Sequence, residues 1–417
     1  MTHSFQSNYK WVVLAVVTFG QATISFGSLS IPPLSGDIVN EFNLSKTEFG
    51  AIMAALYLGA VIASYPFGRL SDNYSVKKIL SLSMMVTGIL VASLYLVRNY
   101  AVMVIAVFLM GLLAYGAANP VTNKAIMGWF PQLNRGTAMG IKQCSVPLGG
   151  MLSAIVFSQL ALHYGWRHAF MMGGIMIILT AIIPMIYYKE PPKPPVNDMI
   201  TMIAISSDND TSPMYPRFRK EIIFISLIAG CLAMVQIAVG TYVVLYLKEV
   251  AFFSVALAGT CLGLTNAGGI VGRISWGLIS DHIFKGKRNI VLQIIACIIG
   301  FITIVLSRYS YTNTNIGKWI LVLIIFVLGF TAFGWNGIFH AYLVELAGLK
   351  QAGTVTGISM SIVFCGNILG PLIFGAIVDM SGGSYRYSWE FISALMVLSV
   401  IFLFLLKVKL MKKGQIG

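Results

Sequence analysis

The sequence predicts an all-α membrane protein in which twelve transmembrane helices form two pseudo-symmetric six-helix bundles. Hydrophobic residues make up 57% of its 417 residues and charged residues only 10%, whereas a soluble domain carries about 25% charged residues. Apolar runs of about 20 residues, the length that crosses a bilayer, recur along the chain. Short motifs of the first half also reappear in the second half at a nearly constant spacing.

Charged or Pro- and Gly-rich breaks between the apolar runs predict where the helices lie. The first six are expected at residues 11–32, 47–67, 79–97, 101–128, 137–162 and 167–188. The second six are expected at residues 221–246, 255–277, 289–307, 319–345, 354–378 and 389–408.

A single long polar segment separates the two sets. It contains EPPKPP and SSDNDTSP, and polar, Pro-rich stretches of this kind act as spacers. We therefore expect an N-terminal bundle over residues 1–188, a cytoplasmic linker over residues 189–220 and a C-terminal bundle over residues 221–417.

The distribution of Lys and Arg predicts that both termini are cytoplasmic, because cytoplasmic loops carry an excess of these residues. In that orientation 18 of the 28 Lys and Arg residues fall on the cytoplasmic side and seven on the outer side, and Lys124, Lys142 and Arg273 remain inside predicted helices. The net charge of +14 is thus read as a topology signal and not as a nucleic-acid-binding surface. We expect a monomeric, multi-pass protein of the cell membrane, surrounded by lipid.

Two pairs of short motifs relate the halves. GRLSDNYSVKK follows the second predicted helix and WGLISDHIFKGKR follows the eighth, which aligns Gly68 and Asp72 with Gly277 and Asp281. GTAMGIKQ opens the fifth predicted helix and GTVTGISM opens the eleventh. Such parallel repeats are a transporter architecture, with the substrate site between the repeats near the middle of the membrane.

The G-x-x-x-D-x-x-x-x-K/R pattern of these loops resembles the signature of the major facilitator superfamily. The stretch WFPQLNRGTAMGIKQ is similar to bacterial members that carry organic or inorganic anions, such as oxalate–formate-type members. The first loop departs from the family pattern, since Asn73 and Ser75 stand where Arg and Gly are usual. The resemblance implies two bundles that rock about a central cavity, and it implies transport by alternating access.

The signature loops supply candidate gating residues. An acid just beyond a helix end can cap a neighbouring helix or pair with a basic residue, and in the family such contacts hold the cytoplasmic side closed. The resemblance assigns this role to Asp72, Asp281, Lys77 and Arg288. The alternative is that the basic residues serve only as topology signals.

Three positive charges lie inside predicted helices, where a charge costs about 2.5–3.5 kcal/mol on insertion scales and therefore suggests a function. Arg273 lies eight residues before Asp281, so about 12 Å into its helix, and its guanidinium does not deprotonate. Its position resembles that of an arginine in dicarboxylate carriers of the superfamily. Their second basic residue has no counterpart in SMSIVFCGN, which begins at Ser359, and Lys142 is a candidate replacement. Lys124 is close enough to its helix end to snorkel.

The acidic residues show the opposite distribution along the chain. They lie in predicted loops or near helix ends, as Glu345 does, and none lies in the middle of a predicted helix. The missing negative charge is therefore expected to come from the substrate, which favours a small anion.

Further polar residues fall at similar depths. Each has helix–helix hydrogen bonding as its ordinary role, and some are candidates to complete a substrate site. Gln143, Asn266 and Asn336 are expected to line the cavity, Tyr57 and Tyr242 to pack against the substrate body, and His340 to titrate or to hydrogen-bond within the bundle. Gln21, Asn119, Asn123, Gln236 and Trp335 complete the set.

The sequence thus predicts a secondary active transporter for a small organic anion, a mono- or dicarboxylate, with Arg273 and Lys142 as the positive groups and a possible coupling ion. No cofactor, metal site or enzyme motif is apparent, because the chain lacks a Walker loop, HExxH and GxSxG. Two alternatives stay open. One is a multidrug or neutral-solute exporter of the same fold, and the other is a non-transporting membrane sensor.

Overall fold

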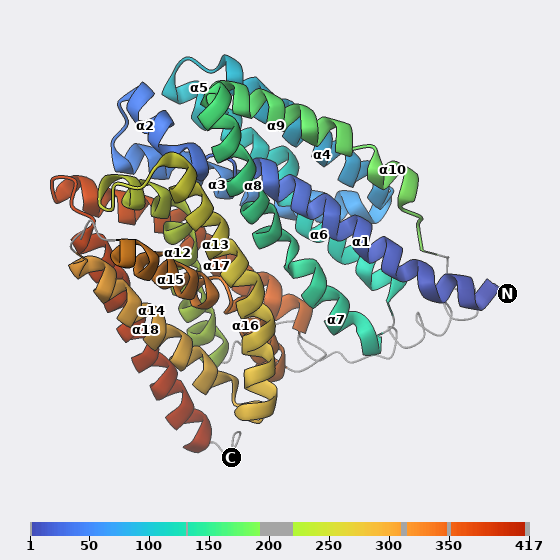
Figure 1. Cartoon of the computed structure of the whole chain (residues 1–417). Coiled ribbons are helices and arrows are strands. Elements are labelled where there is room, and N and C mark those ends of the chain that lie inside the picture. The colour runs from blue at the N-terminus through green and yellow to red at the C-terminus, as the bar shows by residue number, and fades with distance from the viewer. Residues whose placement is uncertain (1, 131, 192–219, 310–314, 348–351, 413–417) are drawn as a thin grey trace.

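The computed structural model describes residues 2–130, 132–191, 220–309, 315–347 and 352–412. Twelve segments of the described chain are long and apolar enough to cross a membrane, which confirms the predicted fold class. Figure 1 shows α1 to α10 as one bundle and α12 to α18 as a second, with the two chain ends toward the same side of the molecule. Most of the linker predicted at residues 189–220 lies outside the described residues.

The N-terminal bundle contains six membrane-crossing segments. Its elements are α1 (Thr2–Ser28), η1 (Pro32–Leu34), α2 (Ser35–Phe42), α3 (Lys46–Asn73), α4 (Val76–Ser93), η2 (Leu94–Leu96), α5 (Tyr100–Met110), η3 (Gly111–Tyr115), α6 (Gly116–Trp129), α7 (Gln132–Gln143), α8 (Ser145–Tyr164), α9 (Trp166–Thr180) and α10 (Ile183–Tyr187).

The C-terminal bundle contains the other six. Its elements are α12 (Lys220–Glu249), α13 (Val255–Leu278), η4 (Ile279–Ile283), α14 (Arg288–Arg308), α15 (Asn315–Ala332), α16 (Asn336–Ala347), α17 (Ala352–Met380) and α18 (Arg386–Lys412).

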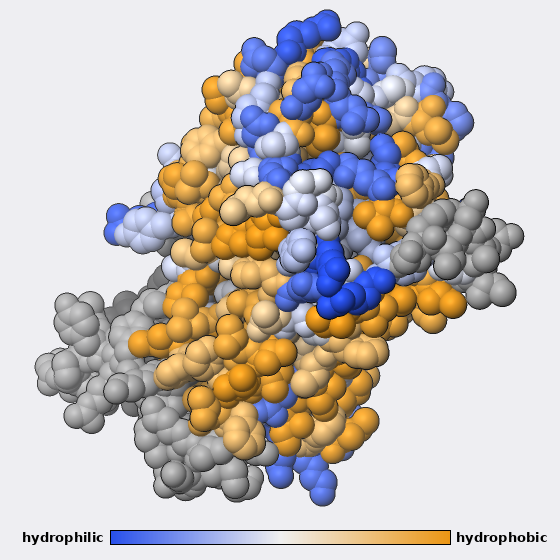
Figure 2. Space-filling model, turned by 90° about the vertical axis from the view of Figure 1, so that its left-hand side faces the viewer, coloured by the Kyte–Doolittle hydropathy of each residue, from blue (hydrophilic) through white to orange (hydrophobic). Residues whose placement is uncertain are grey.

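The surface of the molecule is largely apolar. In Figure 2, hydrophobic residues cover wide areas of the visible face, and hydrophilic residues gather toward its top and centre. Large apolar side chains such as Leu179, Phe301 and Trp319 are about 70% exposed. A surface of this kind is stable against lipid and not against water.

Three predicted helices are each broken into two, and in one of them, predicted at residues 167–188, the break separates α9 from α10. The other two breaks lie next to Arg273. The helix predicted at residues 137–162 is α7 and α8, which meet at Cys144, and the helix predicted at residues 319–345 is α15 and α16, which are separated by residues 333–335. The break at Cys144 has a local cause. Pro147 has no N–H group, so the carbonyl of Gln143, four residues earlier, cannot form its helical hydrogen bond.

Helices α13 and α15 pack closely just before the break between α15 and α16. A Cβ atom at Gly272 would lie 2.0 Å from the carbonyl oxygen of Phe330, and a Cβ atom at Gly329 would lie 2.1 Å from that of Thr265. Only glycine allows two backbones to approach this closely. The approach holds the next residue, Arg273, beside the end of α15.

The bundles are joined at the end opposite the chain termini, where α3 begins and α17 ends. Asp379 of α17 accepts hydrogen bonds from the backbone N–H groups of Lys46 and Thr47, at 2.8 and 2.7 Å. Lys46 also forms an ion pair with Glu249 of α12, at 2.5 Å. The Tyr242 hydroxyl donates to the Lys46 carbonyl oxygen, at 2.5 Å. These contacts close that end of the interface.

Candidate functional site

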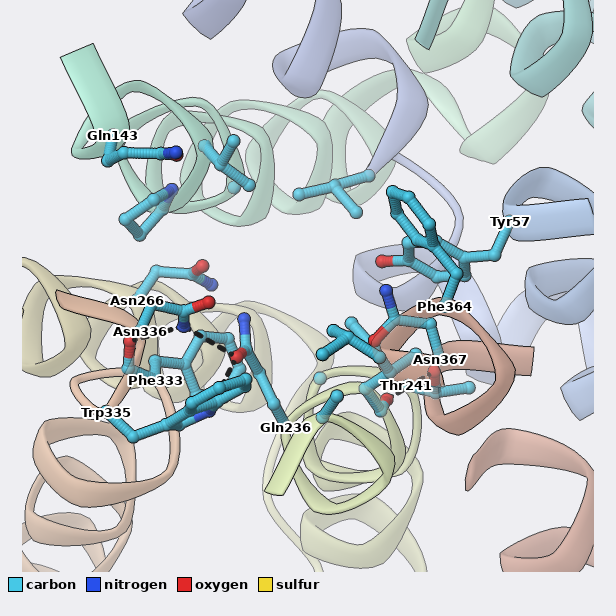
Figure 3. Close-up of a pocket in the computed structure, with 18 of the residues that line it drawn as sticks. Tyr57, Gln143, Gln236, Thr241, Asn266, Phe333, Trp335, Asn336, Phe364 and Asn367 are labelled. Carbon is cyan, nitrogen blue, oxygen red and sulfur yellow. Dashed lines mark hydrogen bonds between the residues drawn. The ribbon is translucent and has the colours of Figure 1, made fainter. Parts of the chain in front are cut away.

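A cavity of about 160 Å³ lies between the two bundles. Its volume is small beside the roughly 300–1,000 Å³ typical of sites for drug-sized ligands, so it fits a small solute. Residues of both bundles line it (Figure 3), and those expected from the sequence to do so are Tyr57, Gln143, Asn266, Arg273, Asn336 and His340.

Arg273 is held by backbone carbonyls that the two helix breaks leave free. Its Nε donates to the carbonyl oxygen of Phe333, at 3.1 Å, in the segment between α15 and α16. Its Nη1 donates to the carbonyl oxygen of Gln143, the last residue of α7. The guanidinium therefore bridges the two bundles at the cavity wall. Both of these acceptors are neutral, so neither offsets its positive charge.

Lys142 lies behind the cavity wall. Its side chain is fully buried, and it is absent from the residues that line the cavity. Its Nζ donates to Oδ1 of Asn119, at 2.9 Å, and to Oδ1 of Asn123, at 2.8 Å. The sequence placed Lys142 at the right depth, but as a direct substrate contact. Of the two asparagines that accept hydrogen bonds from Lys142, Asn119 lines the cavity and Asn123 does not.

A second amide, Gln236 of α12, organises the wall of the C-terminal bundle. Its Oε1 accepts hydrogen bonds from the indole Nε1 of Trp335, at 3.0 Å, and from Nδ2 of Asn336, at 3.1 Å. Figure 3 shows the three side chains converging below the cavity. The break between α15 and α16 places Trp335 and Asn336 at this point.

The remaining expected residues have defined neighbours. The Tyr57 ring packs edge-on against Tyr115, with ring centroids 5.9 Å apart. Asn266 donates from Nδ2 to the Leu262 carbonyl oxygen of its own helix, at 2.9 Å. His340 lies beside the ring of Phe339, with centroids 5.4 Å apart.

Two further positions differ from the expectations. Tyr242 was expected to pack against the substrate body, but its hydroxyl lies in the closed end of the interface, 2.9 Å from the Pro371 carbonyl oxygen. Asn367 of α17 lines the cavity and was not singled out from the sequence. The signal available for it was an isolated amide in an otherwise apolar helix.

The gating candidates lie on the side of the chain termini. Arg288 forms an ion pair with Asp281, at 2.5 Å, and another with Glu345, at 3.2 Å, all three in the C-terminal bundle. Lys77 lies in the first turn of α4. Asp72 belongs to the last turn of α3, but its side chain is outside the described part of the chain. The cross-bundle role of these four residues stays a prediction.

The described residues contain no group of three or more His, Cys, Asp or Glu side chains placed to hold a metal ion. The polar groups that line the cavity are one guanidinium, one imidazole, one indole, two tyrosine hydroxyls, one threonine hydroxyl and a set of amides. Such groups bind and orient a polar solute.

The chain is similar in sequence to several curated membrane proteins. The chain is 22% identical over 354 residues to the hexuronate transporter of Bacillus subtilis (strain 168), covering 83% of this chain and 82% of that protein. It is 24% identical over 428 residues to the probable galactarate/D-glucarate transporter GudP of the same strain, covering 95% and 91%. It is also 23% identical over 385 residues to the membrane sensor protein UhpC of Escherichia coli (strain K12), covering 88% and 85%.

Solved structures share the fold. A bacterial homolog of the human lysosomal transporter Spinster, in an inward-facing and occupied conformation, matches with a TM-score of 0.77 at 18% identity, covering 97% of this chain and 98% of that one. The D-xylose-proton symporter matches with a TM-score of 0.74 at 18% identity, covering 95% and 97%. The family model of the Major Facilitator Superfamily matches residues 17–364. Because that model covers most of the chain, this chain belongs to the Major Facilitator Superfamily.

Proposed function

We propose that the protein is a secondary active transporter that moves a small organic anion across the cell membrane by alternating access. The observation that carries this proposal is Arg273, a guanidinium in the wall of a cavity between two bundles, with two neutral carbonyl groups as its hydrogen-bond acceptors. A guanidinium forms two parallel hydrogen bonds with a carboxylate. An anionic substrate would thus supply the charge that these carbonyls do not.

The substrate class we favour is a hydroxylated carboxylate, that is, a sugar acid. The relatives named for hexuronate and for galactarate/D-glucarate support a carboxylate that carries several hydroxyl groups. The amides of Asn119, Gln236, Asn266, Asn336 and Asn367 are suited to hydroxyl groups, because an amide both donates and accepts hydrogen bonds. A simple mono- or dicarboxylate would leave most of them unused.

The same framework assigns the remaining roles. Both termini lie in the cytoplasm, so the end joined by Asp379 and Lys46 faces outward. Arg273 binds the carboxylate, Tyr57 and His340 flank the substrate, and Asp72, Asp281, Lys77 and Arg288 control the cytoplasmic side. The protein acts as a monomer, and a coupling ion drives accumulation.

Uptake into proteoliposomes tests the assignment. With D-glucuronate as the probe, Arg273→Ala should abolish transport, because removing a charged hydrogen-bond partner costs about 1.5–3 kcal/mol and leaves the anion without a counter-charge. Arg308→Ala is the matched control. Arg308 is 63% exposed and pairs with Glu390, so this variant should transport like the wild type.

The two alternatives give different outcomes. An exporter of neutral solutes or drugs would keep its transport activity in Arg273→Ala. A sensor, as the name of UhpC describes that relative, would bind D-glucuronate but move none of it. Wild-type uptake that depends on Arg273 contradicts both, and undiminished uptake by Arg273→Ala would overturn the site.

A further inference from the structure

We propose that Lys142 is a positioning residue, which orients the amide of Asn119 so that its N–H groups meet the substrate anion. The inference rests on the proposed function, since it names the group that would hold the anion from the N-terminal bundle. Lys142 is 0% exposed, whereas its partner Asn119 lines the cavity. The lysine thus acts on the cavity through one amide and not by direct contact.

The orientation of Asn119 follows from the chemistry of its neighbours. A lysine ammonium group donates hydrogen bonds and accepts none, so the atom 2.9 Å from the Lys142 Nζ must be the amide oxygen of Asn119. Gln21 of α1 donates to the same oxygen from its Nε2, at 3.1 Å. The Gln21 Oε1 lies 2.9 Å from the Thr122 hydroxyl, whose single proton also has the Ala118 carbonyl oxygen within reach, at 2.6 Å. Lys142 therefore sets the orientation, because a rotated Asn119 amide would place its own N–H group against the ammonium, which has no acceptor atom.

This orientation leaves the Nδ2 group of Asn119 for the cavity. With its oxygen engaged by a cation on the far side, the amide is polarised, and a hydrogen bond from its nitrogen to an anion is strengthened. The chain of contacts runs from the ammonium through the amide to the substrate. Arg273 would hold the same anion from the C-terminal bundle, so the anion itself would link the two halves.

Asn123 provides the matched control. Its Oδ1 also accepts from Lys142, at 2.8 Å, but Asn123 is absent from the lining of the cavity. The two asparagines lie one helical turn apart on α6. A role in folding would make them equivalent, whereas a role in positioning makes only Asn119 important for binding.

Binding of D-glucuronate to the purified protein tests the proposal. Asn119→Ala and Lys142→Met should each weaken binding about tenfold or more, the effect of one lost charge-assisted hydrogen bond. Asn123→Ala should bind like the wild type. Asn119→Asp should keep the contact with Lys142 and its unfolding temperature but lose binding, because a carboxylate has no N–H group to offer and repels the anion.

The double variant separates positioning from direct contact. If Lys142 acts through Asn119, adding Lys142→Met to Asn119→Ala weakens binding little further. Additive losses would mean that Lys142 touches the anion itself. Equal losses for Asn123→Ala and Asn119→Ala would mean that the network only maintains the fold. Either result overturns the proposal.

Unfolding temperatures without any solute give a readout independent of the substrate. Lys142→Met and Asn119→Ala should be non-additive in their effect on the unfolding temperature, because the first removes the partner of the second. Independent effects would overturn the contact on which the inference stands. Failure of the wild type to bind D-glucuronate, with the non-additivity intact, would contradict the proposed substrate class and leave the Lys142–Asn119 contact standing.

Discussion

At the scale of single residues, the cavity is organised by amides whose orientations are set by neighbours that only donate. The indole of Trp335 donates and accepts nothing, so the oxygen of Gln236 faces it, at 3.0 Å. The nitrogen of Gln236 is then directed elsewhere, and Gln236 lines the cavity. The wall of the C-terminal bundle therefore has a defined pattern of donors before any solute binds.

Replacing Trp335 by Phe tests this pattern. The variant keeps an aromatic ring but lacks the N–H group, so Gln236 loses a donor worth about 0.5–1.5 kcal/mol. We expect D-glucuronate binding to weaken several-fold and the unfolding temperature to fall, both measured on purified protein. Trp319→Phe is the control, because Trp319 is 70% exposed and should change neither value. Unchanged binding in Trp335→Phe would remove Gln236 from the site.

The sequence alone predicted how deep in the membrane Arg273 and Lys142 lie, but not the direction in which their side chains point. A rise of about 1.5 Å per residue placed Arg273 and Lys142 inside the membrane, and the structure agrees. The sequence could not show whether each side chain faces the cavity, because that depends on how the helices are rotated and bent. Arg273 reaches the cavity, whereas Lys142 points toward α6 and ends at Asn119 and Asn123.

At the scale of helices, the candidate site depends on the breaks at Cys144 and at residues 333–335, which leave the two carbonyl groups that Arg273 contacts. Hydropathy does not reveal them, since the apolar runs continue across Cys144 and across residues 333–335. The sequence therefore predicted the number and the approximate bounds of the twelve helices correctly, but gave no sign of the break at residues 333–335. Pro147 was the available signal for the first one, because a proline frees the carbonyl four residues before it.

Replacing Pro147 by Ala tests the role of the first break. Alanine restores an N–H group, and the Gln143 carbonyl oxygen can then accept a helical hydrogen bond in place of the one from Arg273. We expect an unfolding temperature at or above that of the wild type, because alanine favours a helix more than proline does. We also expect the rate of D-glucuronate uptake to fall.

Pro66→Ala is the control for helix stiffening in general. Pro66 lies inside α3 and is exposed and away from the cavity, so its replacement should leave uptake unchanged. Full uptake by Pro147→Ala would show that Arg273 does not need the freed carbonyl.

At the scale of the whole molecule, the closed end is completed by a contact between bundles. Ser45 and Glu48 form a capping box within α3, with hydrogen bonds of 3.1 and 2.8 Å. That box satisfies two of the four N–H groups that a helix start leaves free. Asp379 of the other bundle satisfies the next two, those of Lys46 and Thr47. The first turn of α3 is thus fully bonded only while the bundles meet.

Replacing Asp379 by Asn should favour opening at this end. The neutral side chain loses the charge-assisted hydrogen bonds at a helix N-terminus, which shifts the equilibrium between closed and open states by about tenfold. A membrane-impermeant maleimide reports the shift. It should label a cysteine placed at Asn367, in a background without the five native cysteines, faster from this side in Asp379→Asn than in the parent.

Glu390→Gln is the matched control for that experiment. Glu390 lies at the same end but pairs with Arg308 and Arg386 of its own bundle, so its loss should not change the labelling rate. Equal labelling in the Asp379 variant and its parent would mean that packing alone closes this end.

The repeat motifs predicted the symmetry of the whole molecule, but no sequence feature identified the closed end. A transporter uses one sequence to stabilise two arrangements of its bundles, so the choice between them depends on small differences in free energy. The two halves also differ at the position of the buried lysine. Lys142 aligns with Ser359, which is buried and hydrogen-bonds to Ser226 at 2.7 Å, so only one half carries a buried cation at this position.

The polar contact between Asp379 and α3 has a consequence for the transport cycle. An interface that must part in every cycle becomes the wall of a water-filled vestibule each time it opens. An apolar seal would then expose hydrophobic surface, at about 25 cal/mol per Å². A carboxylate and two N–H groups are instead rehydrated when they separate, so most of the free energy of the contact is recovered. The same atoms can therefore bond to one another in the closed state and to water in the open state, which makes the closure reversible.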